Sequence, residues 1–198
     1  MSSTNRLFTR LFPRLSKFGQ RAYSGYVDAL HTKPILTKAV TTGTLYFISD
    51  TISQHLENRK KASDEWKFDY VRAFKFSVFG FVITGPTFHF WYHILDTSFP
   101  KKVFSHVIIK AALDQIICAP IFDAVFFMGM GVLDGKSKED IYTKLKNDWL
   151  RTYLVDCAVW PICNIVSFRY ISNKQRVLFM NIVNIGWAAF LASINAGH

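Results

Sequence analysis

Two long apolar stretches with polar side chains in their middles constrain this chain more than any other feature. Residues 71–95 and 103–133 each exceed the roughly 20 residues that an α-helix needs to cross a bilayer. An ionisable side chain at membrane depth costs at least about 2.5–3.5 kcal/mol unless it faces protein, water or a counter-charge. The second stretch nevertheless contains four polar side chains: Lys110, Asp114, Gln115 and Asp123. This pattern predicts a small multi-pass membrane protein with a polar interior.

The other segments favour an all-α fold, a polytopic transmembrane bundle with four to five membrane-embedded helices. The helices are expected at residues 35–56, 71–95, 103–133, 149–171 and 175–194. The first and fourth are polar enough to be partly buried or re-entrant, so four and five spans both stay open. Residues 134–148 predict a short surface helix that begins after a Ser137 cap. At this length, residues 26–198 are expected to form a single multi-pass membrane domain.

The first 25 residues differ in composition from the rest and predict a mitochondrial targeting segment, residues 1–25. They contain no acid, several serines, and apolar residues at helical spacing opposite five cations. The cations are Arg6, Arg10, Arg14, Lys17 and Arg21. An Arg-rich, Ser-bearing, acid-free amphipathic segment is typical of a mitochondrial transit peptide. The alternative is an uncleaved basic helix that lies on a membrane surface.

The net charge of +10 does not indicate a nucleic-acid partner. The 24 Lys and Arg residues are dispersed along the chain and are balanced by acids in most loops. Nucleic-acid binding needs them clustered on one face. We therefore expect the bilayer, small solutes or metabolites, and further copies of the chain as partners.

Polar residues at spacings of three and four suggest a network inside the predicted bundle. Asp50 and Gln54 share a face of the first helix, and Lys110 with Asp114 predicts a local ion pair. The network either fixes the helix register or forms the wall of a water-filled passage. Both hypotheses use the same residues: Asp50, Gln54, Lys110, Asp114 and Gln115. Helix kinks that would open space beside them are expected at Gly85-Pro86, Pro120 and Trp160-Pro161.

Motifs of catalysis and metal binding do not emerge from the sequence, which predicts no enzyme, cofactor or metal site. His89 and His93 lie one helical turn apart, but zinc needs three or four ligands. The glycines of residues 129–135 end a predicted helix and do not follow a strand, so a dinucleotide loop is disfavoured. An odd set of three cysteines, without a C-x-x-C pair, predicts packing rather than a disulfide framework.

A series of short motifs, in order along residues 26–192, resembles the Mpv/PMP/Sym family of peroxisomal and mitochondrial integral membrane proteins. These motifs are Tyr26-x-x-x-Leu30-x-x-x-Pro34, Thr42-Gly43, Asp50-x-x-Ser53-Gln54, Asp69 with Arg72, Gly85-Pro86, Trp91-Tyr92-x-x-Leu95, Leu113-Asp114-Gln115, Ala119-Pro120, Trp160-Pro161 with Phe168, Arg176 and Trp187-x-x-x-Leu191. The chain departs from the family pattern after Trp160-Pro161, where Asn164 and Ser167 stand in place of the family's Gln and Asn.

The resemblance implies an α-helical multi-pass protein, usually described with four spans, in the inner mitochondrial or peroxisomal membrane. Family members are thought to form pores for small solutes and to support mitochondrial metabolite balance. We therefore expect a small-solute channel of the mitochondrial inner membrane, formed by one chain or by a homo-oligomer. The alternatives are a non-conducting membrane scaffold, or the same type of pore in the peroxisomal membrane.

Overall fold

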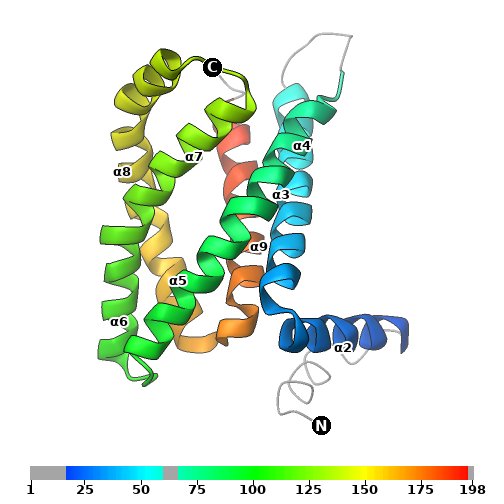
Figure 1. Cartoon of the computed structure of the whole chain (residues 1–198), viewed down its shortest axis with the longest axis vertical. Helices are drawn as coiled ribbons and strands as arrows, with labels where there is room; N and C mark the ends of the chain where they lie inside the picture. The colour runs from blue at the N-terminus through cyan, green and yellow to red at the C-terminus, as the bar shows by residue number, and fades with distance from the viewer. Residues whose placement is uncertain (1–16, 60–66, 196–198) are drawn as a thin grey trace.

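The computed structural model describes residues 17–59 and 67–195, and their regular secondary structure is entirely helical. This confirms the all-α prediction. The first helix, α2 (Lys17–Thr32), lies across one end of the other helices (Figure 1). It runs without a break through the expected end of the targeting segment at residue 25. Arg6, Arg10 and Arg14 lie outside the described residues.

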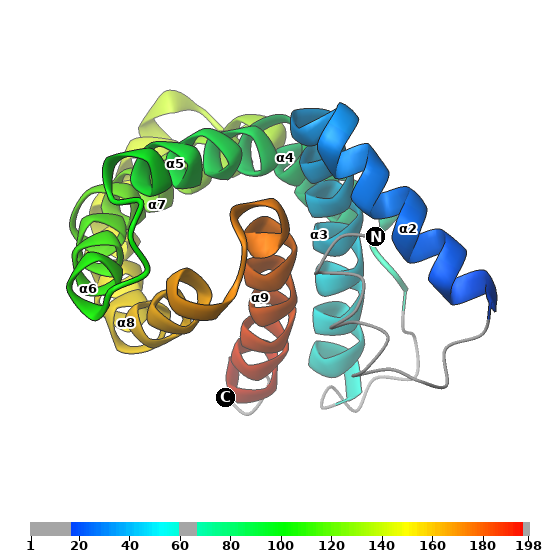
Figure 2. The same ribbon diagram turned by 90° about the horizontal axis from the view of Figure 1, so that it is seen from below.

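Within the described residues the helices form five long rods, which stand side by side and alternate in direction (Figure 1). In chain order they are α3 (Pro34–Arg59), α4–η1–α5 (Tyr70–Phe79, Gly80–Thr84 and Gly85–Ser98), α6–η2–α7 (Phe104–Leu113, Asp114–Cys118 and Ala119–Leu133), α8 (Lys138–Tyr170) and α9 (Asn173–Asn195). Seen along their axes, the rods form a ring in which α9 returns to pack against α3 (Figure 2). Because the number of rods is odd, these two neighbours run parallel.

Local sequence signals explain where several rods begin. The side chain of Asp69 accepts a hydrogen bond from the backbone N–H of Arg72 and caps α4. Ser137 caps α8 in the same way through the N–H of Asp140, at 3.1 Å, as the sequence predicts. The predicted break between a surface helix and a separate helix at 149 is wrong, because α8 is continuous from Lys138 to Tyr170. A change from charged to apolar composition does not interrupt backbone hydrogen bonding.

Two of the three predicted proline kinks lie directly after a π-helical turn. A proline has no N–H to donate, and its ring crowds the carbonyl four residues earlier. The π-helical turns η1 and η2 precede Gly85-Pro86 and Ala119-Pro120, and their wider hydrogen bonds run from Gly85 N to Gly80 O and from Ala119 N to Asp114 O. Pro161 instead lies inside α8, with the α-helix assigned on both sides.

The second rod crosses the first at very close range. A Cβ added to Gly85 would lie 2.6 Å from the Cα of Ala39, and one added to Gly43 would lie 3.0 Å from the carbonyl oxygen of Ser77. Backbone atoms on both sides leave no room for a side chain at these positions. The glycines therefore determine how closely α3 approaches α4–η1–α5.

The distribution of polar and apolar side chains is inverted relative to a water-soluble bundle. The buried side chains include Lys38, Asp50, Lys110, Asp123 and Arg176. The exposed ones include many large apolar residues along every rod: Leu36, Val40, Phe74, Val82, Phe90, Ile94, Ile116, Ile121, Leu154, Ile162 and Ile182. An apolar exterior around a polar interior is typical of a helical protein surrounded by lipid.

One helical stretch in the described part of the chain is both long and apolar enough to cross a membrane by composition. It covers Phe104–Leu133. Its most apolar 18 residues have a mean hydropathy of 2.1, and 17% of them are buried inside the protein. The polar faces of the other rods lower their mean hydropathy. The expected count of four to five spans therefore stays a prediction.

Candidate functional site

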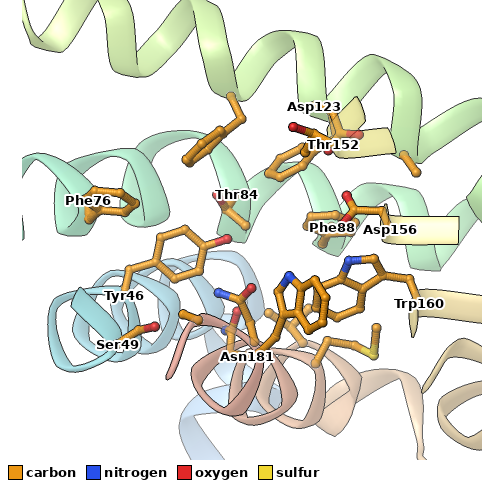
Figure 3. A pocket seen from close by; sticks show the side chains of 18 of the residues that line it. Tyr46, Ser49, Phe76, Thr84, Phe88, Asp123, Thr152, Asp156, Trp160 and Asn181 are labelled. Carbon is orange, nitrogen blue, oxygen red and sulfur yellow. The ribbon is translucent and has the colours of Figure 1, made fainter. Parts of the chain in front are cut away.

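The ring of rods encloses a cavity of about 610 Å³. Side chains from all five rods line it, and Figure 3 shows several of them, including Tyr46, Phe88 and Asp156, converging on the space. Phenyl, phenol and indole rings make up much of the wall. The charged lining residues are Asp50, Glu57, Arg72, Asp114, Asp123 and Asp156. A cavity of this size is within the range that small organic solutes occupy in proteins.

The wall near the start of α4 is built around Asp50 on α3. Its carboxylate accepts from Nε of Arg72 at 2.8 Å and from Nε2 of Gln54 at 2.6 Å. The same guanidinium holds Glu57 through two bonds of 2.9 and 3.0 Å. Gln54 also bonds both backbone groups of Asp69. The predicted proximity of Asp50 and Gln54 is thus confirmed, but Gln54 orients Asp50 rather than lining the cavity.

Deeper in the ring, Asp114 joins three rods. Its carboxylate accepts from the indole Nε1 of Trp91 on α5 at 2.7 Å and from Nδ2 of Asn164 on α8 at 2.5 Å. Both donors are neutral, and the carboxyl group is buried. Gln115, also predicted as a lining residue, instead donates to Sγ of Cys157 at 3.2 Å and lies outside the cavity wall.

The predicted local pair between Lys110 and Asp114 is wrong. The ammonium of Lys110 lies 2.9 Å from the carboxylate of Asp96 on α5, while Asp114 uses neutral donors. The two side chains face different neighbours, because Lys110 is directed to the end of α5 and Asp114 to its middle. A carboxylate on the neighbouring helix α5 replaces the one a turn away on the same rod.

A charged layer closes the end of the ring where α5 ends and α9 begins; we name it the Asp96 cluster. Its members are Asp96, Lys110, Asn173 and Arg176. Asp96 accepts from Arg176 at 2.8 Å and from Asn173 at 3.0 Å, besides Lys110. The side chains of Lys110 and Arg176 are only 3% and 2% exposed.

Aromatic rings reinforce this closed end. The guanidinium of Arg176 lies 4.6 Å from the ring centre of Phe168 and 5.5 Å from that of Tyr92. Both rings belong to the buried apolar core of the molecule. The cavity wall reaches Tyr92 and Val177 but includes no member of the Asp96 cluster. The cavity is therefore blind at this end.

Sequence reasoning missed two features of this site. Arg176 was recognised as part of a family motif, but its burial was not predicted, because Lys174 two residues earlier makes the segment look like an ordinary charged turn. Asp123 and Asp156 were visible as acids in apolar segments, but their contact across α7 and α8 needed the fold. The three cysteines are free thiols, and Cys118 belongs to the cavity wall.

Comparison with known proteins gives the chain its relatives. A sequence model of the Mpv17 / PMP22 family matches residues 131–192. PXMP2/4 family protein 4 of Dictyostelium discoideum is 53% identical over 178 residues, which cover 89% of this chain and 95% of the relative. Peroxisomal membrane protein 2 of Bos taurus is 32% identical, over 91% of this chain and 92% of the relative. No solved structure matches.

A more distant relative is Protein SYM1 of Saccharomyces cerevisiae, 29% identical over 86% of this chain and 88% of the relative. None of these names describes an enzyme. The three alignments cover 86–91% of this chain. The chain therefore belongs to the Mpv17 / PMP22 family of membrane proteins.

Proposed function

We propose that this protein is a small-solute channel of the mitochondrial inner membrane, in which all five rods of the ring are embedded. The observation that carries the proposal is a cavity with six charged lining residues at the centre of a bundle whose outer surface is apolar. Lipid would then contact the apolar outer surface, and solute would contact the charged groups that line the cavity. The chain alone or a homo-oligomer of it could form the channel, since each ring has its own cavity.

The rods have the lengths that this arrangement needs. Among the rods that consist of one uninterrupted helix, the shortest is α9 with 23 residues, which at a rise of about 1.5 Å per residue exceeds the ~30 Å apolar core of a bilayer. The polar faces of α3 and α8 are turned into the ring, where Asp50 and Asn164 find partners. This removes the cost of exposing them to lipid, and it explains why mean hydropathy identifies one span while the geometry supports five.

The blind end of the cavity determines what conduction requires. Solute would enter past Arg72 and Glu57, whose side chains are 38% and 34% exposed, and would stop before the Asp96 cluster. Conduction therefore needs the Asp96 cluster to separate. The same closed end favours a second candidate, a non-conducting membrane scaffold whose polar interior holds the rods in register.

Single-channel recording distinguishes these functions. The full chain is reconstituted in planar bilayers beside the double variant Asp50→Asn, Asp114→Asn, with Asp148→Asn as the control. Asp148 forms an exposed pair with Lys144 outside the cavity. A channel predicts discrete openings whose conductance or ion preference changes in the double variant and not in the control. Silence from folded, inserted protein across voltages would support the scaffold.

The compartment is part of the same proposal. The name of the bovine relative places that protein in the peroxisomal membrane. For this chain, the basic, acid-free first 25 residues support the mitochondrial inner membrane. The peroxisomal membrane is the alternative, and the import experiment described in the Discussion separates the two.

A further inference from the structure

The described cavity lining carries five carboxyl groups and one guanidinium. That guanidinium, Arg72, is shared by Asp50 and Glu57. Asp114 accepts hydrogen bonds from neutral donors and interacts with the buried Arg176 through charge alone, and no cation among the described residues interacts with Asp123 or Asp156. The cavity wall of a chain with a net charge of +10 is thus acidic.

One carboxyl oxygen and one amide oxygen in the wall are buried without a donor from the described residues. One is Oδ2 of Asp123, whose residue is 8% exposed, and the other is Oδ1 of Asn164, at 1%. Leaving a buried acceptor unsatisfied costs about 1–3 kcal/mol, and more when it is charged. Both residues line the cavity, so a ligand there could supply the missing hydrogen bonds. Such a ligand would have to carry hydrogen-bond donors.

The unsatisfied acceptors belong to two acidic stations, each formed between the third rod and α8. Asp114 with Asn164 forms one, and the contacting carboxyl groups of Asp123 and Asp156 form the other. Two contacting carboxylates repel unless a proton or a cation lies between them. Asp156 and Asn164 are eight residues apart on one helix, which separates the stations by about 12 Å.

The wall between the two stations is mainly apolar. It contains Cys118, Ala119 and Phe122 on the third rod and Trp160 on α8. Figure 3 shows Trp160 beside Asp156 at this part of the cavity. Methylene groups pack well on such a surface, and an indole face also attracts a nearby ammonium group. Along the wall, an acidic surface is followed by an apolar one and then by a second acidic one. This order matches a molecule with an apolar middle and a cation at each end.

We propose that the cavity binds an aliphatic diamine or polyamine, with one ammonium group at Asp123 and Asp156 and another at Asp114 and Asn164. Each ammonium group has N–H donors for the unsatisfied acceptors, and the chain between them lies on the apolar wall. A neutral diol, a short diamine that reaches one station, and an anion fit this surface poorly. The inference rests on the proposed function in one respect, since solute must be able to enter the cavity.

Isothermal titration of the purified full chain in detergent tests the inference with three probes. Diaminooctane can reach both stations, diaminopropane can reach one, and octanediol has the length without the charge. We expect one diaminooctane to bind per chain, and both other probes to bind about tenfold more weakly or not at all. Equal affinity for octanediol would overturn the cationic site. Equal affinity for diaminopropane would overturn the two-station arrangement.

Variants locate the site. Asp123→Asn and Asp156→Asn are each expected to weaken diaminooctane binding about tenfold or more, and Asp148→Asn is expected to leave it unchanged. Asp156 is only partly buried, so its variant keeps the test valid if Asp123→Asn does not fold. Unchanged affinity in a folded variant would refute the assignment. Because binding is measured without a membrane, it can succeed when conduction fails, and the reverse also holds.

Discussion

Replacing Asp96 by asparagine should destabilise the protein far more than a typical single charge change. The carboxylate of Asp96 is the acceptor for both Lys110 and Arg176, whose side chains are 3% and 2% exposed. Asparagine keeps the size and one oxygen but removes the counter-charge. The buried Lys110 and Arg176 then lose the counter-charge that they share.

The size of the effect follows from burial. Removing one partner of a buried ion pair costs about 3–5 kcal/mol. The side chain of Asp96 is 26% exposed, so water reaches it and we expect a loss of about 2–4 kcal/mol. For a chain of this size that corresponds to a fall in Tm of roughly 5–15 °C. Thermal unfolding in detergent, followed by circular dichroism, measures it.

The control is Asp148→Asn, which breaks the exposed pair with Lys144 and should cost about 0.5 kcal/mol or less. Equal Tm shifts in the two variants would refute the reasoning that the Asp96 cluster is a desolvated support of the closed end. If the protein conducts, Asp96→Asn should also increase the fraction of time that the channel is open.

Three further predictions concern packing, access and targeting. Gly85→Ala should lower the free energy of unfolding by about 1–3 kcal/mol, because its Cβ would meet the backbone of Ala39. The control is Gly186→Ala, whose Cβ meets nothing within 4 Å and which should be neutral or slightly stabilising. Urea or thermal unfolding compares the two variants. Access to the cavity can be tested in a background without native cysteines. Ser53→Cys, in the cavity wall, should react with a water-soluble thiol reagent, and Ser167→Cys, outside the wall and fully buried, should not. Equal protection of both cysteines would contradict solute access. Neutralising the leader arginines should abolish mitochondrial import in a fluorescence localisation assay, and unchanged import would contradict the targeting assignment. The arginines are Arg6, Arg10, Arg14 and Arg21.

The helical content and much of the polar interior could be predicted because both leave a periodic trace in the sequence. Asp50 and Gln54 share a helix face at a spacing of four, and the structure joins them as that spacing requires. Asp114 was recognisable as an acid that an apolar helix would have to bury. Its predicted role in a passage remains a prediction, although its place in the cavity wall agrees with it.

Features that depend on which rods become neighbours could not be predicted in this way. Lys110 has Asp114 one turn away, yet it pairs with Asp96, because the turn between α5 and α6 brings that carboxylate to it. The π-helical turn η1 follows from how the backbone accommodates Pro86, a local distortion that has no periodic signature. Composition also misplaced the start of the fourth rod, since charged residues extend a helix as readily as apolar ones.

The parallel contact between α3 and α9 has a consequence for how the protein is made. The hydroxyl of Thr42 accepts a hydrogen bond from Asn181, a partner 139 positions later in the chain. If the rods are embedded as proposed, the first four are made before α9 can cover this side of the cavity. Insertion of α9 is the step that completes the ring. A product truncated before α9 would lack the part of the cavity wall that Val177, Met180 and Asn181 form, and Thr42 would lose its partner.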